Sequence, residues 1–449
     1  MQDRKFCFVA AVLLSSMMIF CPVVFAADRD QVLTLRESIR IALAHNATIH
    51  SAAEGVKASE SKRKEAMTGF FPKLSTYYSY QRLNEPPEIK GLPIGTGTVV
   101  TGTQDNYNWA LELRQPVFAG GGILANYQIN RIESSISRLD EMTTTQDIIQ
   151  EVEVSYFTIL KALKIRDVAA QSVEQLKAHR DVARNFFDVG MIPKNDLLNS
   201  EVQLANGQQY LLRAENDVEL AKAQFNTVLR RGLNSPVVVE DILAYKPFQR
   251  DLADCLKTAM DNRPEAKSYS LRVEQAGKSV DLARSEFFPS ISLIGNYSKY
   301  GDTPELAGSR FSNSEFWYVM AQANWNIWEW GRTKYKVDAS LSRKSQAADA
   351  LTNILDRIAL EVKNAYLLLK EAEKRIVVAG KAIEQAEENF RINQERYKEH
   401  VATSTDVIDA QTLLTRAKSD YFNALSDYNI AMARLERSMG TIYASVNKE

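Results

Sequence analysis

The chain repeats itself, and this repeat limits its possible folds more than any other feature. Phe70-Phe71-Pro72 recurs as Phe287-Phe288-Pro289 at an offset of 217 residues; further along the offset becomes 210, where Asp196 corresponds to Asp406. Repetition at a fixed separation is typical of a fold built from two copies of one structural unit. The first unit therefore carries about seven extra residues, which we place in the loop Asn84–Gln104 because it is rich in turn-forming residues.

Each unit is predicted to open with a capped helix. A capping side chain, Thr34 or Asp251, is followed three residues later by a carboxylate, which is the usual signal for a helix N-terminus. The two helices are expected over about 34–68 and 251–285, where each ends at a Phe-Phe-Pro sequence.

After each Phe-Phe-Pro sequence the apolar residues alternate with period two, which predicts two β-hairpins with strands of about ten residues. The residues on the shared face are Leu74, Thr76, Tyr78 and Tyr80; Tyr107, Trp109, Leu111 and Leu113; Ile291, Leu293, Gly295 and Tyr297; and Trp317, Val319, Ala321, Ala323, Trp325 and Ile327. This length and aromatic-rich face are typical of outer-membrane strands. A soluble sheet packed on a core would show the same alternation.

Very long helices are predicted beyond each hairpin. Residues 123–189 contain neither glycine nor proline, so one helix there would be roughly 100 Å long. Large and small residues form adjacent columns at seven-residue steps: Leu204, Leu211, Val218 and Phe225 beside Gly207, Ala214, Ala221 and Val228, and again Leu414, Tyr421, Tyr428 and Leu435 beside Ala417, Ala424, Ala431 and Ser438. Such columns let antiparallel helices approach closely, which predicts coiled-coil packing.

The N-terminus predicts export from the cytoplasm. Basic residues at positions 4–5 precede the apolar run Phe6–Phe25, and Val24-Phe25-Ala26 fits a cleavage site. We therefore expect residues 1–26 to be a signal peptide, with a membrane anchor as the less favoured alternative. Only Cys255 then remains, which excludes an internal disulfide. The mature net charge of about −2 argues against binding of nucleic acid, which requires a basic face.

Four strands cannot close a barrel on their own, since single-chain barrels need about eight. An open sheet edge in lipid would leave backbone groups unpaired at several kcal/mol each. If the hairpins enter a membrane, several chains must share one barrel. The two helical turns, Val189–Pro193 and His400–Thr403, would then lie about 100 Å away, so a barrel that continues into a helical tube fits these parts.

In these features the chain resembles the TolC family of outer membrane efflux proteins. The resemblance covers nearly the whole mature chain and includes Gln115-Pro116-Val117-Phe118, the turn Val189-Gly190 and the segment Thr405–Gln411. It implies an α+β membrane protein: a homotrimer whose 12-stranded outer-membrane β-barrel, four strands per chain, continues into a long periplasmic α-helical coiled-coil barrel. It also implies a passive exit duct, which receives small molecules from an inner-membrane pump of RND, ABC or MFS type through a periplasmic adaptor (membrane fusion) protein.

The same resemblance divides the chain into two structural repeats, 27–232 and 251–440. An equatorial segment, 233–250, separates them, and a C-terminal tail follows at 441–449. The implied location is the outer membrane, in contact with its lipid, with an extension into the periplasm.

Asp406 and Asp409 are the strongest candidates for a gate. They lie three residues apart at the start of the last helix, so they share a face, although helix capping would explain them equally well. The resemblance implies that they line a closed periplasmic entrance, where six carboxylates of a trimer would raise one another's pKa and attract cations. Tyr397 matches a position that helps to tie this entrance shut. Ala402 replaces the family's arginine, and His400 replaces the glycine of the second turn.

The two helical turns are the candidate docking site for the adaptor. Their residues are Val189, Gly190, Met191, Ile192 and Pro193 in the first unit and His400, Val401, Ala402 and Thr403 in the second. Exposed Met191 and Ile192 would suit a small apolar contact. The alternative is that these residues only close the helical hairpins.

No catalytic, cofactor or metal site is predicted, and the chain is not expected to be an enzyme. It has no Walker sequence, and His45 and His50 lie five residues apart rather than the four that place two ligands together on a helix. Two other functions stay open: the exit duct of a type I protein secretion system and, less favoured, a periplasmic coiled-coil structural protein without a pore.

Overall fold

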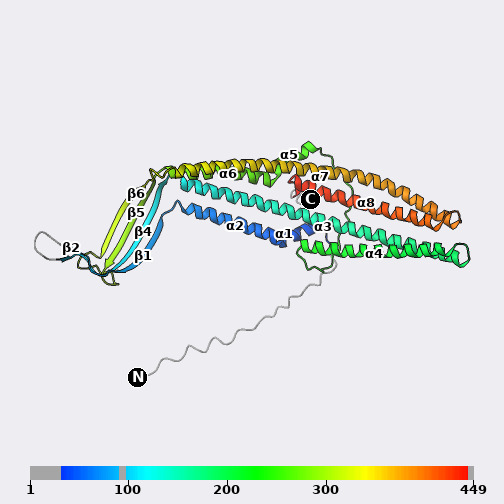
Figure 1. The fold of residues 1–449 in the computed structure, drawn as a ribbon, viewed down its shortest axis with the longest axis horizontal. Coiled ribbons are helices and arrows are strands. Elements are labelled where there is room, and N and C mark those ends of the chain that lie inside the picture. Colours follow the sequence, from blue (N-terminus) through cyan, green and yellow to red (C-terminus); the bar gives the residue numbers. More distant parts are fainter. Residues whose placement is uncertain (1–31, 90–97, 443–449) are drawn as a thin grey trace, which may run out of the picture.

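The computed structural model describes residues 32–89 and 98–442. The predicted signal peptide and nearly all of the predicted tail lie outside these residues, as does the middle of the loop Asn84–Gln104. The molecule is a long rod with a β-sheet at one end, two helical turns at the other and short helices near its middle (Figure 1).

The elements follow the same order twice. The first set is α1 (Leu35–His45), α2 (Ala47–Thr68), β1 (Lys73–Arg82), the short hairpin β2 (Glu88–Ile89) and β3 (Val99–Val100), β4 (Asp105–Ala119), α3 (Gly122–Asp188) and α4 (Lys194–Val228). The second set is α5 (Leu252–Asn262), α6 (Pro264–Arg284), the turn η1 (Ser285–Phe287), β5 (Ser290–Gly301), β6 (Glu315–Asn324), α7 (Arg332–Lys398) and α8 (Ser404–Ser438). Helices α3 and α7 have 67 residues each and α4 and α8 have 35 each, so the duplicated long helices are confirmed.

Each opening helix is capped as predicted. The Thr34 hydroxyl accepts the Glu37 N–H at 3.2 Å, and Asp251 Oδ1 accepts the Asp254 N–H at 2.7 Å. The prediction of one unbroken helix is wrong in both units, because the chain leaves helical geometry at Asn46 and at Arg263.

Each break has a local cause. Asn46 starts α2 by accepting the Thr48 N–H through its side chain at 2.8 Å. Pro264 starts α6 because its ring disfavours helical geometry at Arg263 and it has no N–H to donate, which is tolerated at the first helical position.

The four long strands form one antiparallel sheet in the order β1-β4-β5-β6. Its register pairs Leu74 with Leu113, Leu111 with Tyr297 and Tyr297 with Trp317, so the predicted apolar residues within these strands share one face. Strands β1 and β6 each have one edge without a partner strand in this sheet.

Strand β6 ends earlier than predicted. The last residue of β6, Asn324, pairs with Ser290, the first residue of β5. The residue before Ser290 is Pro289, which has no N–H to extend the pairing. Trp325 and Ile327 therefore lie beyond the strand, in the linker to α7.

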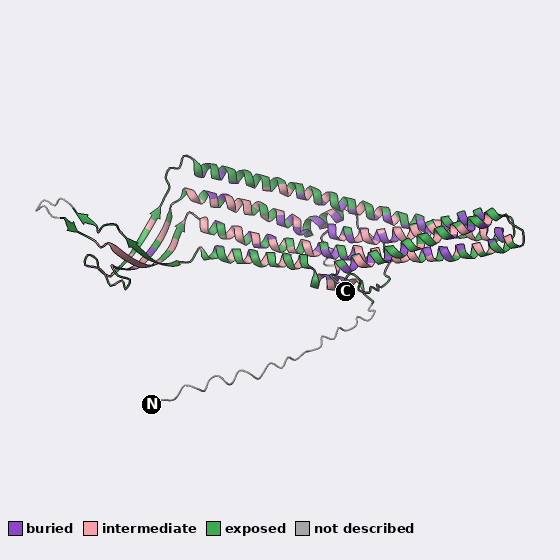
Figure 2. Ribbon diagram, turned by 60° about the horizontal axis from the view of Figure 1, so that its bottom comes forward, coloured by how far each residue is buried: buried purple, intermediate pink, exposed green. Residues whose placement is uncertain are grey.

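The middle of the rod is held by two buried tyrosines. Tyr156 on α3 donates its hydroxyl to the carbonyl of Leu33 at 3.0 Å, or to that of Glu240 at 2.9 Å, and Tyr428 on α8 donates to the carbonyl of Lys246 at 2.5 Å. The segment between the repeats thereby binds both helical pairs. Buried residues gather along the helices, whereas the strands are largely exposed or intermediate (Figure 2).

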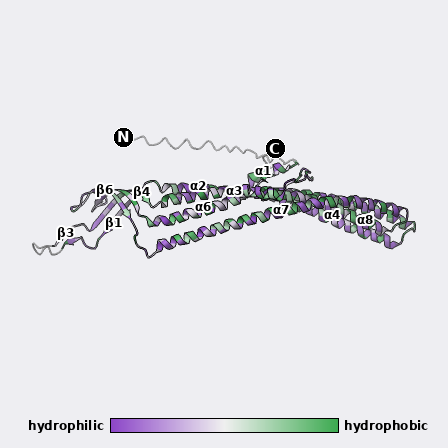
Figure 3. Ribbon diagram, turned by 90° about the horizontal axis from the view of Figure 1, so that it is seen from above, coloured by the Kyte–Doolittle hydropathy of each residue, from purple (hydrophilic) through white to green (hydrophobic). Residues whose placement is uncertain are grey.

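No helix in the described ranges combines the length and the apolar character needed to cross a membrane. Hydrophobic and hydrophilic residues are interspersed along the long helices, as coiled-coil packing requires (Figure 3).

Candidate gate and docking site at the helical end

The two helical turns have the same backbone. Gly190 and His400 both adopt left-handed geometry, with φ of 78° and 60°. The next residue in each turn reaches back to close the helix: Met191 N–H donates to the Phe186 carbonyl at 2.8 Å, and Val401 N–H donates to the Arg396 carbonyl at 2.9 Å. This is a Schellman C-cap, which favours glycine at the left-handed position. His400 thus holds a geometry that its counterpart achieves with glycine.

The turns expose a small apolar surface. Val189, Met191 and Val401 are among the exposed large hydrophobic residues of the chain. Ile192 and Ala402 are partly buried beside them, while Pro193, His400 and Thr403 are exposed. The candidate docking residues therefore lie together at the free end of the helical pairs (Figure 1).

Asp406 takes part in capping α8, but the capping residue itself is Thr403. The Thr403 hydroxyl accepts the Asp406 N–H at 3.2 Å, and Asp406 Oδ2 accepts the Thr403 N–H at 2.8 Å. This reciprocal pair is a capping box. Asp406 Oδ2 accepts hydrogen bonds from the Thr403 N–H and from the Thr403 hydroxyl, each at 2.8 Å, and these two bonds lower the pKa of Asp406. Asp409 is exposed on the next turn of the helix.

Tyr397 is buried inside the helical end. Its ring lies 4.9 Å from the His179 ring and 5.6 Å from the Phe186 ring, centroid to centroid. Burial and the nearby carboxylate of Asp196 raise the pKa of its phenol.

A buried polar cluster next to Tyr397 was missed by the sequence analysis. His179 Nε2 on α3 is hydrogen-bonded to Ser404 Oγ at 2.8 Å, and Ser404 Oγ lies 3.0 Å from Ser200 Oγ on α4. Burial lowers the pKa of His179 to about 4, so the ring is neutral at neutral pH. The cluster joins the start of α8 to both helices of the other pair.

The contact between α3 and α8 is also polar next to this cluster, on the side away from the turns. The Gln411 side chain donates to Gln175 Oε1 at 2.7 Å and to Ser172 Oγ at 3.4 Å, and Thr415 donates to Ser172 Oγ at 3.1 Å. We call Ser172, Gln175, His179, Ser404, Gln411 and Thr415 the polar seam. Ser172 and His179 lie seven residues apart, as do Ser404 and Gln411; this spacing was the signal in the sequence that could have revealed the seam.

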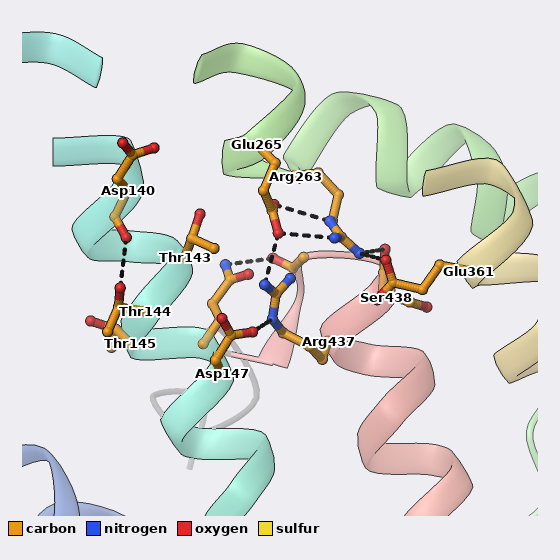
Figure 4. Close-up of polar contacts among 12 residues, drawn as sticks. Asp140, Thr143, Thr144, Thr145, Asp147, Arg263, Glu265, Glu361, Arg437 and Ser438 are labelled. Atoms are coloured by element: carbon orange, nitrogen blue, oxygen red, sulfur yellow. Dashed lines mark hydrogen bonds and ion pairs between the residues drawn. The ribbon is translucent and has the colours of Figure 1, made fainter. Parts of the chain in front are cut away.

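A second polar cluster lies near the middle of the rod (Figure 4). Glu265 accepts from Arg263 Nε at 3.0 Å and from Arg437 Nη2 at 2.7 Å; Arg437 also pairs with Asp147 at 2.7 Å, and Arg263 with Glu361 at 3.1 Å. Burial would raise the pKa of Glu265, but the two guanidinium groups outweigh it and hold that pKa below its usual value. The cluster joins the α5–α6 break to α3, α7 and the end of α8.

Both clusters hold helices against one another. Among the residues that the structure describes, no carboxylate pairs with the buried His179 imidazole, so the pair of His179 and Ser404 lacks the third group that orients the base in nucleophilic catalysis. Among the described residues, no group of three or more His, Cys, Asp or Glu side chains is placed to hold a metal ion.

Comparison with known proteins defines the class. The outer membrane efflux protein family matches residues 38–229 and 255–441, and the chain belongs to that family. The protein is therefore an efflux channel protein of the outer membrane that extends into the periplasm, and not an enzyme, as the sequence predicted.

Among its relatives is the probable efflux pump outer membrane protein TtgC of Pseudomonas putida, which is 20% identical over 391 residues, or 86% of this chain and 78% of TtgC. The outer membrane protein TolC of Escherichia coli K12 is 20% identical over 415 residues, or 88% of this chain and 80% of TolC. The solved structure of the outer-membrane channel OprN superposes with a TM-score of 0.78 at 17% identity and covers 91% of this chain and 90% of OprN. The fold predicted from the resemblance is confirmed.

Proposed function

We propose that three copies of this chain form one passive exit duct, with a 12-stranded barrel in the outer membrane and a helical tube in the periplasm. The four-stranded sheet carries this proposal. It has one apolar face, and β1 and β6 each leave one edge unpaired. In lipid those edges require partner strands, and neighbouring copies would supply them.

The duct accepts small molecules that an inner-membrane pump delivers through a periplasmic adaptor. Support for efflux comes from the family of the chain and from relatives such as TtgC, which is described as an efflux pump component. Support for an adaptor comes from the exposed apolar residues Val189, Met191 and Val401 at the free turns. In the same proposal Asp406, Asp409 and Tyr397 belong to the periplasmic gate.

The division into repeats at 27–232 and 251–440, joined by 233–250, belongs to this proposal. Helices that correspond between the two repeats would alternate around the tube, and the segment 233–250 would encircle its middle. The hydrogen bonds from Tyr156 and Tyr428 to this segment support that arrangement.

The assembly is tested by the mass of the detergent-solubilised protein and by its conductance in planar bilayers. A trimeric mass with discrete channel openings is expected. A monomer that remains dispersed after detergent removal would overturn the proposal and favour the structural coiled-coil alternative.

The partner is tested by photo-crosslinking from Met191 and Val401 in the native envelope, followed by mass spectrometry. Capture of a periplasmic adaptor is expected, and the pump type that the adaptor serves separates small-molecule efflux from protein secretion. Replacement of exposed Val202 on α4 by the same photo-crosslinker is the control, because it lies away from the turns. Failure to capture an adaptor from either turn would overturn the docking assignment.

A further inference from the structure

Three of the five tryptophans lie within six residues of one another, in the linker between β6 and α7. Trp325, Trp328 and Trp330 are 56%, 74% and 85% exposed, and Tyr335 in the first turn of α7 is 67% exposed. Large exposed apolar patches mark contact surfaces, so these rings indicate a partner outside the single chain.

The first repeat provides an internal comparison. Phe118, near the end of β4, corresponds to Trp328, and Gly120 corresponds to Trp330. The turn itself has the same geometry in both repeats, with φ of 58° at Gly120 and 53° at Trp330. A bulky residue at positive φ is unusual. Since the turn forms with glycine in the first repeat, the fold itself does not require an indole at this position.

The start of α7, directly after the linker, carries positive charge that the corresponding residues of the first repeat lack. Residues 325–336 include Arg332, Lys334 and Lys336 with a single acidic residue, Glu329, whereas residues 115–126 carry no charge. Arg332 pairs with Glu329 at 2.8 Å and with Glu286 of η1 at 3.7 Å, and Glu286 also pairs with Lys336. The three cations and two carboxylates leave one net positive charge. Lys334 is exposed at the start of α7.

The position of the linker identifies the partner. It lies where the sheet ends and the periplasmic helices begin (Figure 1). Trp325 follows the alternation of the apolar face of β6, and its Nε1–H donates to the Phe287 carbonyl at 3.0 Å. The aromatic cluster is therefore continuous with the face that would meet lipid, at its periplasmic border. Indole rings favour such borders because they combine an apolar body with one polar N–H.

We propose that residues 325–336 bind the headgroup region of the periplasmic leaflet, and that exposed Lys334 makes this site prefer anionic phospholipids. The continuous apolar face and the net positive charge both match such a leaflet. The inference rests on the proposed placement of the sheet in the membrane, but it does not depend on the pump or the adaptor.

The depth of the rings is tested with single-tryptophan variants in vesicles of phosphatidylcholine brominated near the headgroup or near the chain end. One variant keeps Trp328 and the other keeps Trp317, with the other four tryptophans replaced by phenylalanine. Trp317 lies exposed on the apolar face of β6 and serves as the matched control. We expect the shallow bromines to quench Trp328 more strongly and the deep bromines to quench Trp317 more strongly.

The outcomes separate the two proposals. If Trp317 is quenched and Trp328 is quenched by neither lipid, another copy of the chain or water covers the linker, and the headgroup site is overturned. If neither residue is quenched, the placement of the sheet in the membrane fails first.

The charge preference is tested by adding brominated phosphatidylglycerol to phosphatidylcholine vesicles that contain the Trp328 variant. Lys334→Gln should reduce the preference for the anionic lipid measurably, up to the roughly fivefold effect of one lysine near a membrane surface. Lys363→Gln, an exposed lysine further along α7, is the matched control and should leave the preference unchanged. Equal quenching by both lipids in the Trp328 variant itself would overturn the preference.

Discussion

His179 on α3 and Ser404 at the start of α8 are joined by a buried hydrogen bond of 2.8 Å between Nε2 and Oγ. The helices run antiparallel, so the same register brings Ser172 beside Gln411 and places the Ser426 hydroxyl 3.0 Å from the Phe157 carbonyl. The α3–α8 contact is therefore polar near the turns, whereas apolar clusters dominate near the middle of the rod. Since folding exchanges hydrogen bonds to water for hydrogen bonds within the protein, each such bond adds only about 0.5–1.5 kcal/mol net, so the contact near the turns depends less on apolar burial than the contact near the middle.

The first prediction concerns His179, whose buried ring has a pKa of about 4. The unfolded chain has the ordinary value near 6.5 and binds more protons between these limits. His179 therefore leaves stability intact above about pH 6.5 and reduces it progressively as the pH falls toward 4, by at most about 3 kcal/mol. His179→Gln should remove this loss, measured as the change in Tm between pH 7 and pH 4.5 in detergent.

His50→Gln is the control for that measurement, since His50 is exposed on α2. It should retain the pH dependence of the unsubstituted protein. If acidification lowers the Tm of His179→Gln as much as that of the unsubstituted protein, the buried histidine does not cause the pH dependence.

The second prediction concerns Glu153, a buried carboxyl on α3. Burial, with a smaller contribution from Glu436, raises its pKa to about 8. The pKa of Glu153 in the folded chain therefore exceeds its value of about 4.3 in the unfolded chain. The contribution of Glu153 to folding stability is complete below about pH 4.3 and is lost as the pH rises toward 8. Glu153→Gln cannot ionise and should raise Tm at pH 8 while changing it little at pH 4.5. The reverse pattern would contradict a protonated Glu153 in the native state.

The third prediction concerns Glu265, which accepts hydrogen bonds from both buried arginines. Glu265→Gln would leave Arg263 and Arg437 without their shared carboxylate. Removing one partner of a buried ion pair costs about 3–5 kcal/mol, so a clear fall in Tm is expected. Glu361→Gln is the matched control, since that carboxylate also pairs with Arg263 but its side chain is 46% exposed, against 16% for Glu265, and it should change Tm less. Equal effects of the two substitutions would argue against the buried cluster as the stabilising element.

The fourth prediction concerns the left-handed residues of the two turns. His400→Gly should stabilise the second turn by up to about 1 kcal/mol, because glycine adopts positive φ without strain. Gly190→Ala should destabilise the first turn by a similar amount. Amide hydrogen exchange at the ends of α3 and α7 measures both effects locally. Faster exchange in His400→Gly would show that the imidazole, 4.5 Å from the Phe186 ring, contributes more than the strain removes.

The sequence predicted the repeated elements because their signals are local. Phe70-Phe71-Pro72 and Phe287-Phe288-Pro289 mark the junctions of helix and strand, and period-two alternation marks the apolar face that the sheet register confirms. The helix break before Pro264 also has a local signal, because proline favours the first position of a helix. The break at Asn46 has a weaker signal, since it depends on one side-chain cap.

The polar clusters could not be predicted in the same way because their partners lie far apart along the chain. His179 and Ser404 are 225 residues apart, and Arg437 and Asp147 are 290 residues apart. In the sequence, each residue of such a pair is indistinguishable from an ordinary exposed polar residue on a long helix. The burial of Tyr397 likewise depends on His179 and Phe186, which lie beside it because α3 and α7 both pack against α8.

The last prediction separates the two roles of the carboxylates at the start of α8. Asp406 accepts the Thr403 N–H in a capping box, whereas Asp409 is exposed one turn later. If three copies gather these side chains around an entrance, Asp406→Asn with Asp409→Asn should weaken cation preference and block by divalent cations in bilayer conductance, because six negative charges would be lost. Asp420→Asn, exposed further along α8, is the control and should leave conductance unchanged. Asparagine can still accept the Thr403 N–H, so amide exchange in the first turn of α8 should change little in the double variant. Unchanged selectivity and block with a normal first turn would leave Asp406 with capping alone and would remove both residues from the gate.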